Sequence, residues 1–124
     1  MTFIFTILGL IFGLFSGLIF NNYTGTQAQA SDIERKNDIN SIYQKLEEHH
    51  NEYGEYPTRD ELLLNSEENL PGLDPEALVD PNGKRINNGD YAYLPDDCTA
   101  IGCGKYVLSA KLDDGSEFTK QSLN

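Results

Sequence analysis

The chain has 124 residues and a mass of 13.9 kDa, which limits it to one small globular domain. It carries 20 acidic and 9 basic side chains, a formal net charge of −11, and no charged residue precedes Asp32. Proteins bind nucleic acids chiefly through Lys and Arg that displace counterions, so this balance argues against direct nucleic-acid binding.

Residues 1–20 are predominantly apolar and contain no charge. As a helix this segment would extend about 30 Å, the thickness of the hydrocarbon layer of a bilayer. We therefore expect a single transmembrane helix, with the lipid bilayer as its partner. Ala28-Gln29-Ala30 before Ser31 also has the small-x-small form of a signal-peptidase site. The alternative is therefore a secreted soluble protein that is cleaved after Ala30.

Three glycines, Gly9, Gly13 and Gly17, recur at every fourth position of this segment. Small residues at that spacing share one helix face and let two helices approach closely in lipid. We therefore predict that they pack against a neighbouring helix. The basic residues Arg35 and Lys36 follow the segment and, by the positive-inside rule alone, favour a cytoplasmic domain.

Residues 21–30 show no apolar period and are interpreted as a linker or a polar extension of the first helix. Ser31 and Glu34 have the spacing of a capping box, which predicts a second helix from Ser31 to Gly54. Its predicted apolar face comprises Ile33, Ile39, Ile42, Tyr43, Leu46, His50 and Tyr53. Its predicted solvated face comprises Asp32, Arg35, Lys36, Asp38, Lys45, Glu47, Glu48 and Glu52.

Residues 57–90 are predicted to be a long connection with little regular structure. Thr58 and Glu61 form a second capping-box pattern ahead of a short helix. Asp74 before Pro75 indicates one further helical turn. Asp80-Pro81-Asn82-Gly83 has the composition of a tight turn.

The C-terminal third predicts an antiparallel sheet. Residues 105–112 alternate, with Tyr106, Leu108, Ala110 and Leu112 on one face. A turn at 113–116 leads to a return strand at 117–120, and residues 91–94 supply a third strand. The predicted fold class is α+β, with an amphipathic helix packed on a small antiparallel sheet over residues 31–124, preceded by the transmembrane helix.

The only two cysteines, Cys98 and Cys103, are predicted to form a disulfide that closes a short loop. A zinc site would need a second pair of ligands, and a redox pair would favour two intervening residues. A disulfide places the domain outside the cytoplasm, against the weak indication from the basic residues.

The search for chemistry yields no catalytic motif. His49 and His50 lie beside several glutamates, but adjacent helical residues point about 100° apart and do not readily chelate one ion. The pairs Asp96-Asp97 and Asp113-Asp114 could bind calcium only weakly, since no twelve-residue calcium loop is present. We expect no enzyme activity, no cofactor and no metal.

The order of these segments resembles type IV pilins and the major pseudopilins of type II secretion. The most specific part is the helix end at Tyr53-Gly54-x-Tyr56-Pro57-Thr58, and the Asp80-Pro81-x-Gly83 turn before a Tyr-rich sheet with a small Cys loop supports it. The resemblance covers about residues 32–124. The family's processing site, a basic leader ending in Gly and followed by Phe and then Glu, is not recognisable in residues 1–20.

The resemblance implies a structural subunit whose N-terminal helices pack in the core of a thin filament, with other pilin-like subunits as partners. Tyr91, Tyr93 and Tyr106 would then be core or interface aromatics. The expected location is the cell membrane or a cell-surface filament, with an extracytoplasmic domain. A non-polymerising envelope domain that displays an acidic binding surface is a second possibility.

Overall fold

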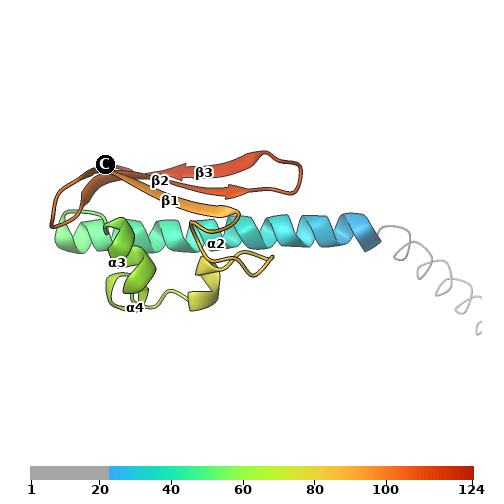
Figure 1. Cartoon of the computed structure of the whole chain (residues 1–124), viewed down its shortest axis with the longest axis horizontal. Helices are drawn as coiled ribbons and strands as arrows, with labels where there is room; N and C mark the ends of the chain where they lie inside the picture. Colours follow the sequence, from blue (N-terminus) through green and yellow to red (C-terminus); the bar gives the residue numbers. More distant parts are fainter. Residues whose placement is uncertain (1–22) are drawn as a thin grey trace, which may run out of the picture. The chain divides into compact units, whose positions relative to one another are not determined.

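The computed structural model describes residues 23–124, and its first element is the long helix α2 (Tyr23–Tyr53) (Figure 1). Three short helical segments follow: α3 (Arg59–Leu64), α4 (Ser66–Asn69) and the 3-10 helix η1 (Pro75–Leu78). The chain then forms strands β1 (Tyr91–Cys98), β2 (Cys103–Lys111) and β3 (Glu117–Gln121). Residues 31–124 form one unit, which contains all of these elements except the start of α2.

The strands form an antiparallel sheet in the order β1-β2-β3, which confirms the predicted meander. Tyr93 pairs with Leu108 and Ala110 pairs with the partly buried Phe118, so the core-facing positions of neighbouring strands lie opposite one another. In Figure 1 the sheet runs along one side of α2, and α3 and α4 lie on another side. The α+β architecture of residues 31–124 is therefore as expected.

The membrane-spanning part of the expected fold class is contradicted. No helix within residues 23–124 is long and apolar enough to cross a membrane. The longest, α2, has 31 residues, but charged side chains recur along it from Asp32 onward. The segment to which the expectation assigned the spanning helix, residues 1–20, lies outside the described residues.

The predicted start of the second helix is also wrong, because α2 is already helical at Tyr23 and continues through Ser31. Ser31 lies inside the helix and caps no helix end. Residues 23–30 are thus a polar helical extension rather than an irregular linker. The predicted end is confirmed: α2 stops at Tyr53, and Gly54 follows with φ +79°, a conformation that glycine adopts without strain.

The buried face of α2 differs from the predicted face by a small rotation. Ile39, Ile42 and Leu46 are fully buried as expected, whereas Ile33 and Tyr53 are 58% and 60% exposed. The buried series is Arg35, Ile39, Ile42, Leu46 and His49, in regular steps of four and three. Arg35 therefore lies in the helix–sheet interface in place of the predicted Ile33, and His49 is buried beside the turn after α2, where its Nδ1 lies 2.8 Å from the Glu55 carbonyl oxygen.

The connection between α2 and the sheet is more ordered than predicted. Thr58 and Glu61 form both bonds of the expected capping box at the start of α3, and Asp74 caps η1. Helix α4 was not predicted. Leu62, Leu70 and Leu78 from this connection join the core that the sheet and α2 form.

Candidate functional site

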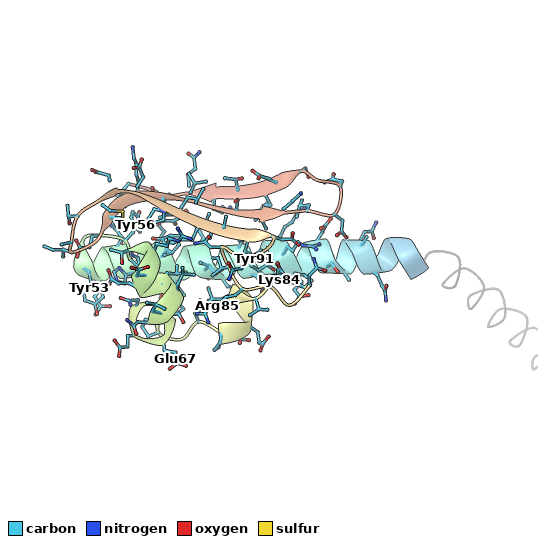
Figure 2. The ribbon with its side chains drawn as sticks, in the orientation of Figure 1. Tyr53, Tyr56, Glu67, Lys84, Arg85 and Tyr91 are labelled. Carbon is cyan, nitrogen blue, oxygen red and sulfur yellow. A yellow bond between two sulfur atoms is a disulfide. The ribbon has the colours of Figure 1, made fainter. Side chains whose placement is uncertain are left out.

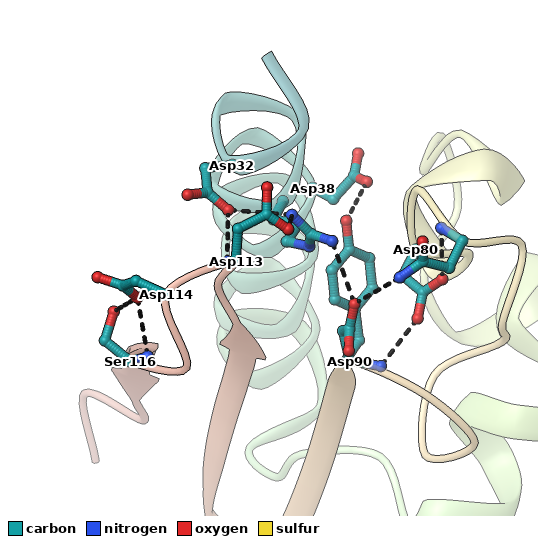
Figure 3. A network of polar contacts seen from close by, with 10 residues as sticks. Asp32, Asp38, Asp80, Asp90, Asp113, Asp114 and Ser116 are labelled. Atoms are coloured by element: carbon teal, nitrogen blue, oxygen red, sulfur yellow. Dashed lines mark hydrogen bonds and ion pairs between the residues drawn. The ribbon is translucent and has the colours of Figure 1, made fainter. Parts of the chain in front are cut away.

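Arg35 is the centre of a charged cluster at the N-terminal end of the helix–sheet interface (Figure 3). Arg35 is only 3% exposed, so a positively charged side chain is buried in the interface. Arg35 Nη1 donates to Asp32 Oδ1 at 3.0 Å and to Asp113 Oδ1 at 3.1 Å, and Nη2 donates to Asp90 Oδ2 at 3.2 Å. Burial opposes this charge, but Asp113, Asp90 and Asp32 together hold the pKa of the guanidinium above its ordinary value. The cluster therefore ties α2 to the loop before β1 and to the turn after β2.

Asp90 connects this cluster to a second polar centre, the buried carboxylate of Asp80. Asp80 Oδ1 accepts from the backbone N–H groups of Asn82 and Lys84, at 3.0 and 2.9 Å. Its other oxygen accepts from the N–H of Asp90 at 2.8 Å. One carboxylate thus joins the two ends of the 80–90 loop through three hydrogen bonds. These bonds offset the cost of burying an acidic side chain that is only 4% exposed.

Tyr91 joins the beginning of β1 to α2. Its hydroxyl donates to Asp38 Oδ2 at 2.6 Å, and its ring is fully buried. Burial and the neighbouring Asp38 carboxylate raise the pKa of Tyr91 far above its ordinary value. Burial also raises the pKa of Asp38, assisted by the nearby charges of Glu34, Asp74 and Glu76, although the bond from Tyr91 opposes the shift.

Near the other end of the interface, Glu47 accepts hydrogen bonds from two tyrosine hydroxyls. Tyr56 donates to Oε1 and Tyr106 donates to Oε2, both at 2.7 Å. The two rings meet edge to face with centroids 4.7 Å apart, a favourable geometry for aromatic pairs. Burial and the Glu47 carboxylate raise the pKa of Tyr106 far above its ordinary value, so this hydroxyl remains a donor. Asn124 Nδ2 donates to the Tyr56 hydroxyl at 3.1 Å, which adds the end of the described chain to the network.

The predicted disulfide between Cys98 and Cys103 is present and bridges the facing ends of β1 and β2. Cys103 also exchanges two backbone hydrogen bonds with Tyr56, at 2.8 and 2.9 Å. Tyr93 donates its hydroxyl to the carbonyl of Pro57 at 2.6 Å. The Gly54 to Pro57 segment is thereby fixed to the sheet at two points, and Tyr56 and Pro57 are buried.

The other residues singled out from the sequence fall in different places. Asp80, Pro81 and Gly83 form the expected turn, in which the Gly83 N–H donates to the Asp80 carbonyl at 2.9 Å. Tyr91, Tyr93 and Tyr106 are core residues, as expected. Gly9, Gly13 and Gly17 lie outside the described residues. The structure thus brings the family-motif tyrosine Tyr56 together with the disulfide, but it keeps the Asp80 turn at the Arg35 end of the interface.

Three helical residues that build these contacts, Arg35, Asp38 and Glu47, are predicted from the sequence to lie on a solvated face, whereas they bind side chains of the sheet and its loops. Two signals could have identified them. Arg35 precedes Ile39 by four residues and so continues the spacing of the buried face. The chain also has several tyrosines in predicted core positions, and a buried hydroxyl needs an acceptor, which the acidic residues of the helix supply.

Within residues 23–124, no group of three or more His, Cys, Asp or Glu side chains is arranged to hold a metal ion. The carboxylates Glu34, Asp38, Asp74 and Glu76 do line one shallow hollow between α2 and η1. The contacts described above hold the elements of residues 31–124 together. No family model, curated protein or solved structure matches this chain.

Proposed function

We propose that this chain is a pilin-like structural subunit of a type IV pilus or a type II secretion pseudopilus, with residues 31–124 as its extracytoplasmic domain. The observation that carries the proposal is the attachment of α2 to the sheet and its loops by polar contacts along the helix. Arg35, Asp38 and Glu47 each bind side chains of the later elements. From Arg35 to Glu47 the helix rises by about 18 Å, so these contacts are spread over several turns.

This distribution suits a subunit that transmits force. When one end of a helix is pulled parallel to a sheet, contacts at different heights are loaded together, and no single contact carries the whole load. Ile39, Ile42 and Leu46 lie between these polar contacts along the helix and are fully buried in the core. A domain of this construction resists sliding of the helix along the sheet.

The route of the chain after α2 further supports the proposal. The turn at Gly54, Tyr56 and Pro57 leads out of the helix, and the bonds from Tyr93 and Cys103 fix it to the sheet. The disulfide then closes the β1–β2 end next to that turn. In the proposed assembly the partners are other pilin-like subunits, contacted in part through the N-terminal segment.

Fractionation of sheared surface filaments tests the proposal. The full chain is produced in a cell that assembles such filaments, the filaments are sheared off and pelleted, and the chain is detected with an antibody. We expect it in the filament pellet, and a marker enzyme of the cell envelope controls for contamination. A chain that stays with the cells, or a soluble form in the medium whose N-terminal sequence begins at Ser31, contradicts the proposal.

A matched pair of variants tests the role of the polar contacts. Arg35→Met removes the centre of the charged cluster, whereas Lys84→Met removes the same charge from an exposed loop residue (Figure 2). We expect filaments that contain the Arg35 variant to break into shorter pieces under shear. Filaments of equal length from both variants would show that the cluster carries no load.

A further inference from the structure

The two edge strands of the sheet differ in whether their outward-facing backbone groups are hydrogen-bonded. At the outer edge of β1, Asn87 takes the place of a neighbouring strand: its backbone N–H donates to the Tyr91 carbonyl at 2.7 Å. Its side chain donates to the Tyr93 carbonyl at 3.2 Å and accepts from the Tyr93 N–H at 2.7 Å. Asn87 reaches this position with φ 69°, which Asn tolerates better than most residues. The β1 edge is therefore covered where these groups lie.

The outer edge of β3 has no such cover within residues 23–124 (Figure 1). The Ser116 carbonyl and the Ser122 N–H both bond toward β2, to Leu112 and Tyr106. Because backbone groups alternate along a strand, those of Phe118 and Lys120 also face β2. The N–H and C=O groups of the three residues between them, Glu117, Thr119 and Gln121, therefore point outward, and all three residues are exposed.

We infer that this edge binds the same edge of a second copy of the chain, in an antiparallel pair of β3 strands with a two-fold axis at Thr119. In that register Thr119 faces Thr119 of the other copy, and Glu117 faces Gln121. Each facing pair of outward residues exchanges two backbone hydrogen bonds. The pairing joins two sheets into one and satisfies the edge groups, as in other cases of strand addition.

The side chains select this register and this occupant. Thr–Thr pairs across strands are favourable, and Glu117 opposite Gln121 avoids a like-charge pair. On the other face, Phe118 lies opposite Lys120 of the second copy, and Lys120 is already placed 5.7 Å from the Phe118 ring of its own chain. A shift of the two-fold axis to Lys120 would place the two lysines opposite each other. A shift to Phe118 would leave Gln121 without a facing residue of β3.

Charge substitutions at one exposed position give a sharp test. Gln121→Lys places a lysine opposite Glu117 of the other copy, and Gln121→Glu places a glutamate there. Cross-strand pairs contribute about 0.2–1 kcal/mol each, and symmetry doubles the change. Sedimentation equilibrium of the full chain in a non-ionic detergent should therefore show a dimer tightened roughly two- to thirty-fold by Gln121→Lys and weakened by a similar factor by Gln121→Glu.

A second measurement locates the contact. Both natural cysteines are in the disulfide, so one introduced thiol reacts alone. A short bifunctional thiol reagent should link Thr119→Cys chains into dimers, whereas Ser109→Cys, on the same sheet face but one strand further inside, should stay unlinked. The inference is overturned by a monomer at every concentration, by equal affinities of the two Gln121 variants, or by equal linking at both positions. This interaction does not depend on the proposed filament function, whose test is independent.

Discussion

Raising the pH from about 7 to about 11 should destabilise this fold steeply, because its core contains tyrosines that stay protonated when folded. Tyr91, Tyr93 and Tyr106 are at most 2% exposed, and each hydroxyl donates to an acceptor in the protein. Burial, with the adjacent carboxylates, raises the pKa of all three well above the ordinary value of about 10. Between pH 7 and pH 11 these three hydroxyls therefore lose their protons in the unfolded chain but not in the folded one.

The direction and size of the change in unfolding free energy follow from the number of protons that each state binds. Below pH 10 both states keep the three protons, and the hydroxyls contribute their full stability. Above pH 10 the unfolded chain releases protons that the folded chain retains, so the free energy of unfolding falls as pH rises. Each tyrosine contributes at most about 1.4 kcal/mol per pH unit, which gives about 4 kcal/mol for three at pH 11. Small domains have only about 5–15 kcal/mol in total.

Urea unfolding at a series of pH values, followed by circular dichroism, measures this effect. The chain's two cysteines are joined to each other, so thiol exchange at high pH does not complicate the experiment. Tyr93→Phe should lower the stability at pH 7 by about 1 kcal/mol through loss of one hydrogen bond, and it should reduce the slope above pH 10 by about one proton. Tyr53→Phe is the matched control, since a ring that is 60% exposed meets similar solvent in both states. A stability that is flat up to pH 11, or equal slopes for both variants, would refute the reasoning.

The expected effects of four further changes can be measured by urea unfolding at pH 7. Arg35→Met should lower the free energy of unfolding by about 3 kcal/mol. This is at the lower end for a broken buried ion pair, because the aspartate partners keep 24–42% of their side chains exposed. A loss of stability no larger than that of Lys84→Met would contradict this prediction. Asp38→Asn should change stability by less than about 0.5 kcal/mol, since burial already raises the pKa of that carboxyl and the amide oxygen still accepts from Tyr91. Asp38→Ala leaves the Tyr91 hydroxyl without an acceptor and should cost about 1–3 kcal/mol, so equal costs for the two variants would count against this account. Replacing Cys98 and Cys103 by Ser should cost about 2 kcal/mol on the chain-entropy model, and wild-type stability in reducing buffer that equals its stability in oxidising buffer would argue against it.

The local elements of the fold were largely predictable because each depends on neighbouring residues. The strands near 91–94, 105–112 and 117–120, the capping box at Thr58 and the turn at Asp80 follow from alternation, side-chain capping and turn composition. Gly54 marked the end of α2 for the same reason. Helix α4 and the continuation of α2 back to Tyr23 carry no comparable local signal, and both were missed.

The polar contacts were not predictable in detail because they join residues that are far apart in the sequence. Arg35 and Asp113 are separated by 78 positions, and Glu47 and Tyr106 by 59. In a surface rich in acidic residues, nothing local distinguishes Glu47, which accepts two buried hydroxyls, from Glu48, which does not. The assignment requires the partner tyrosines to be placed first.

The unbroken helix through Ser31 bears on how this chain could be cut. Proteases bind their substrates as extended peptides, and a segment inside a regular helix must unwind before it can be accepted. Ala28, Gln29 and Ala30 all lie within α2, so the backbone hydrogen bonds of the helix protect the small-x-small sequence directly before Ser31. Cleavage there would be governed by how often this stretch of helix opens, and a substitution that loosens the helix, such as Gln29→Gly, should make the bond more sensitive to added protease.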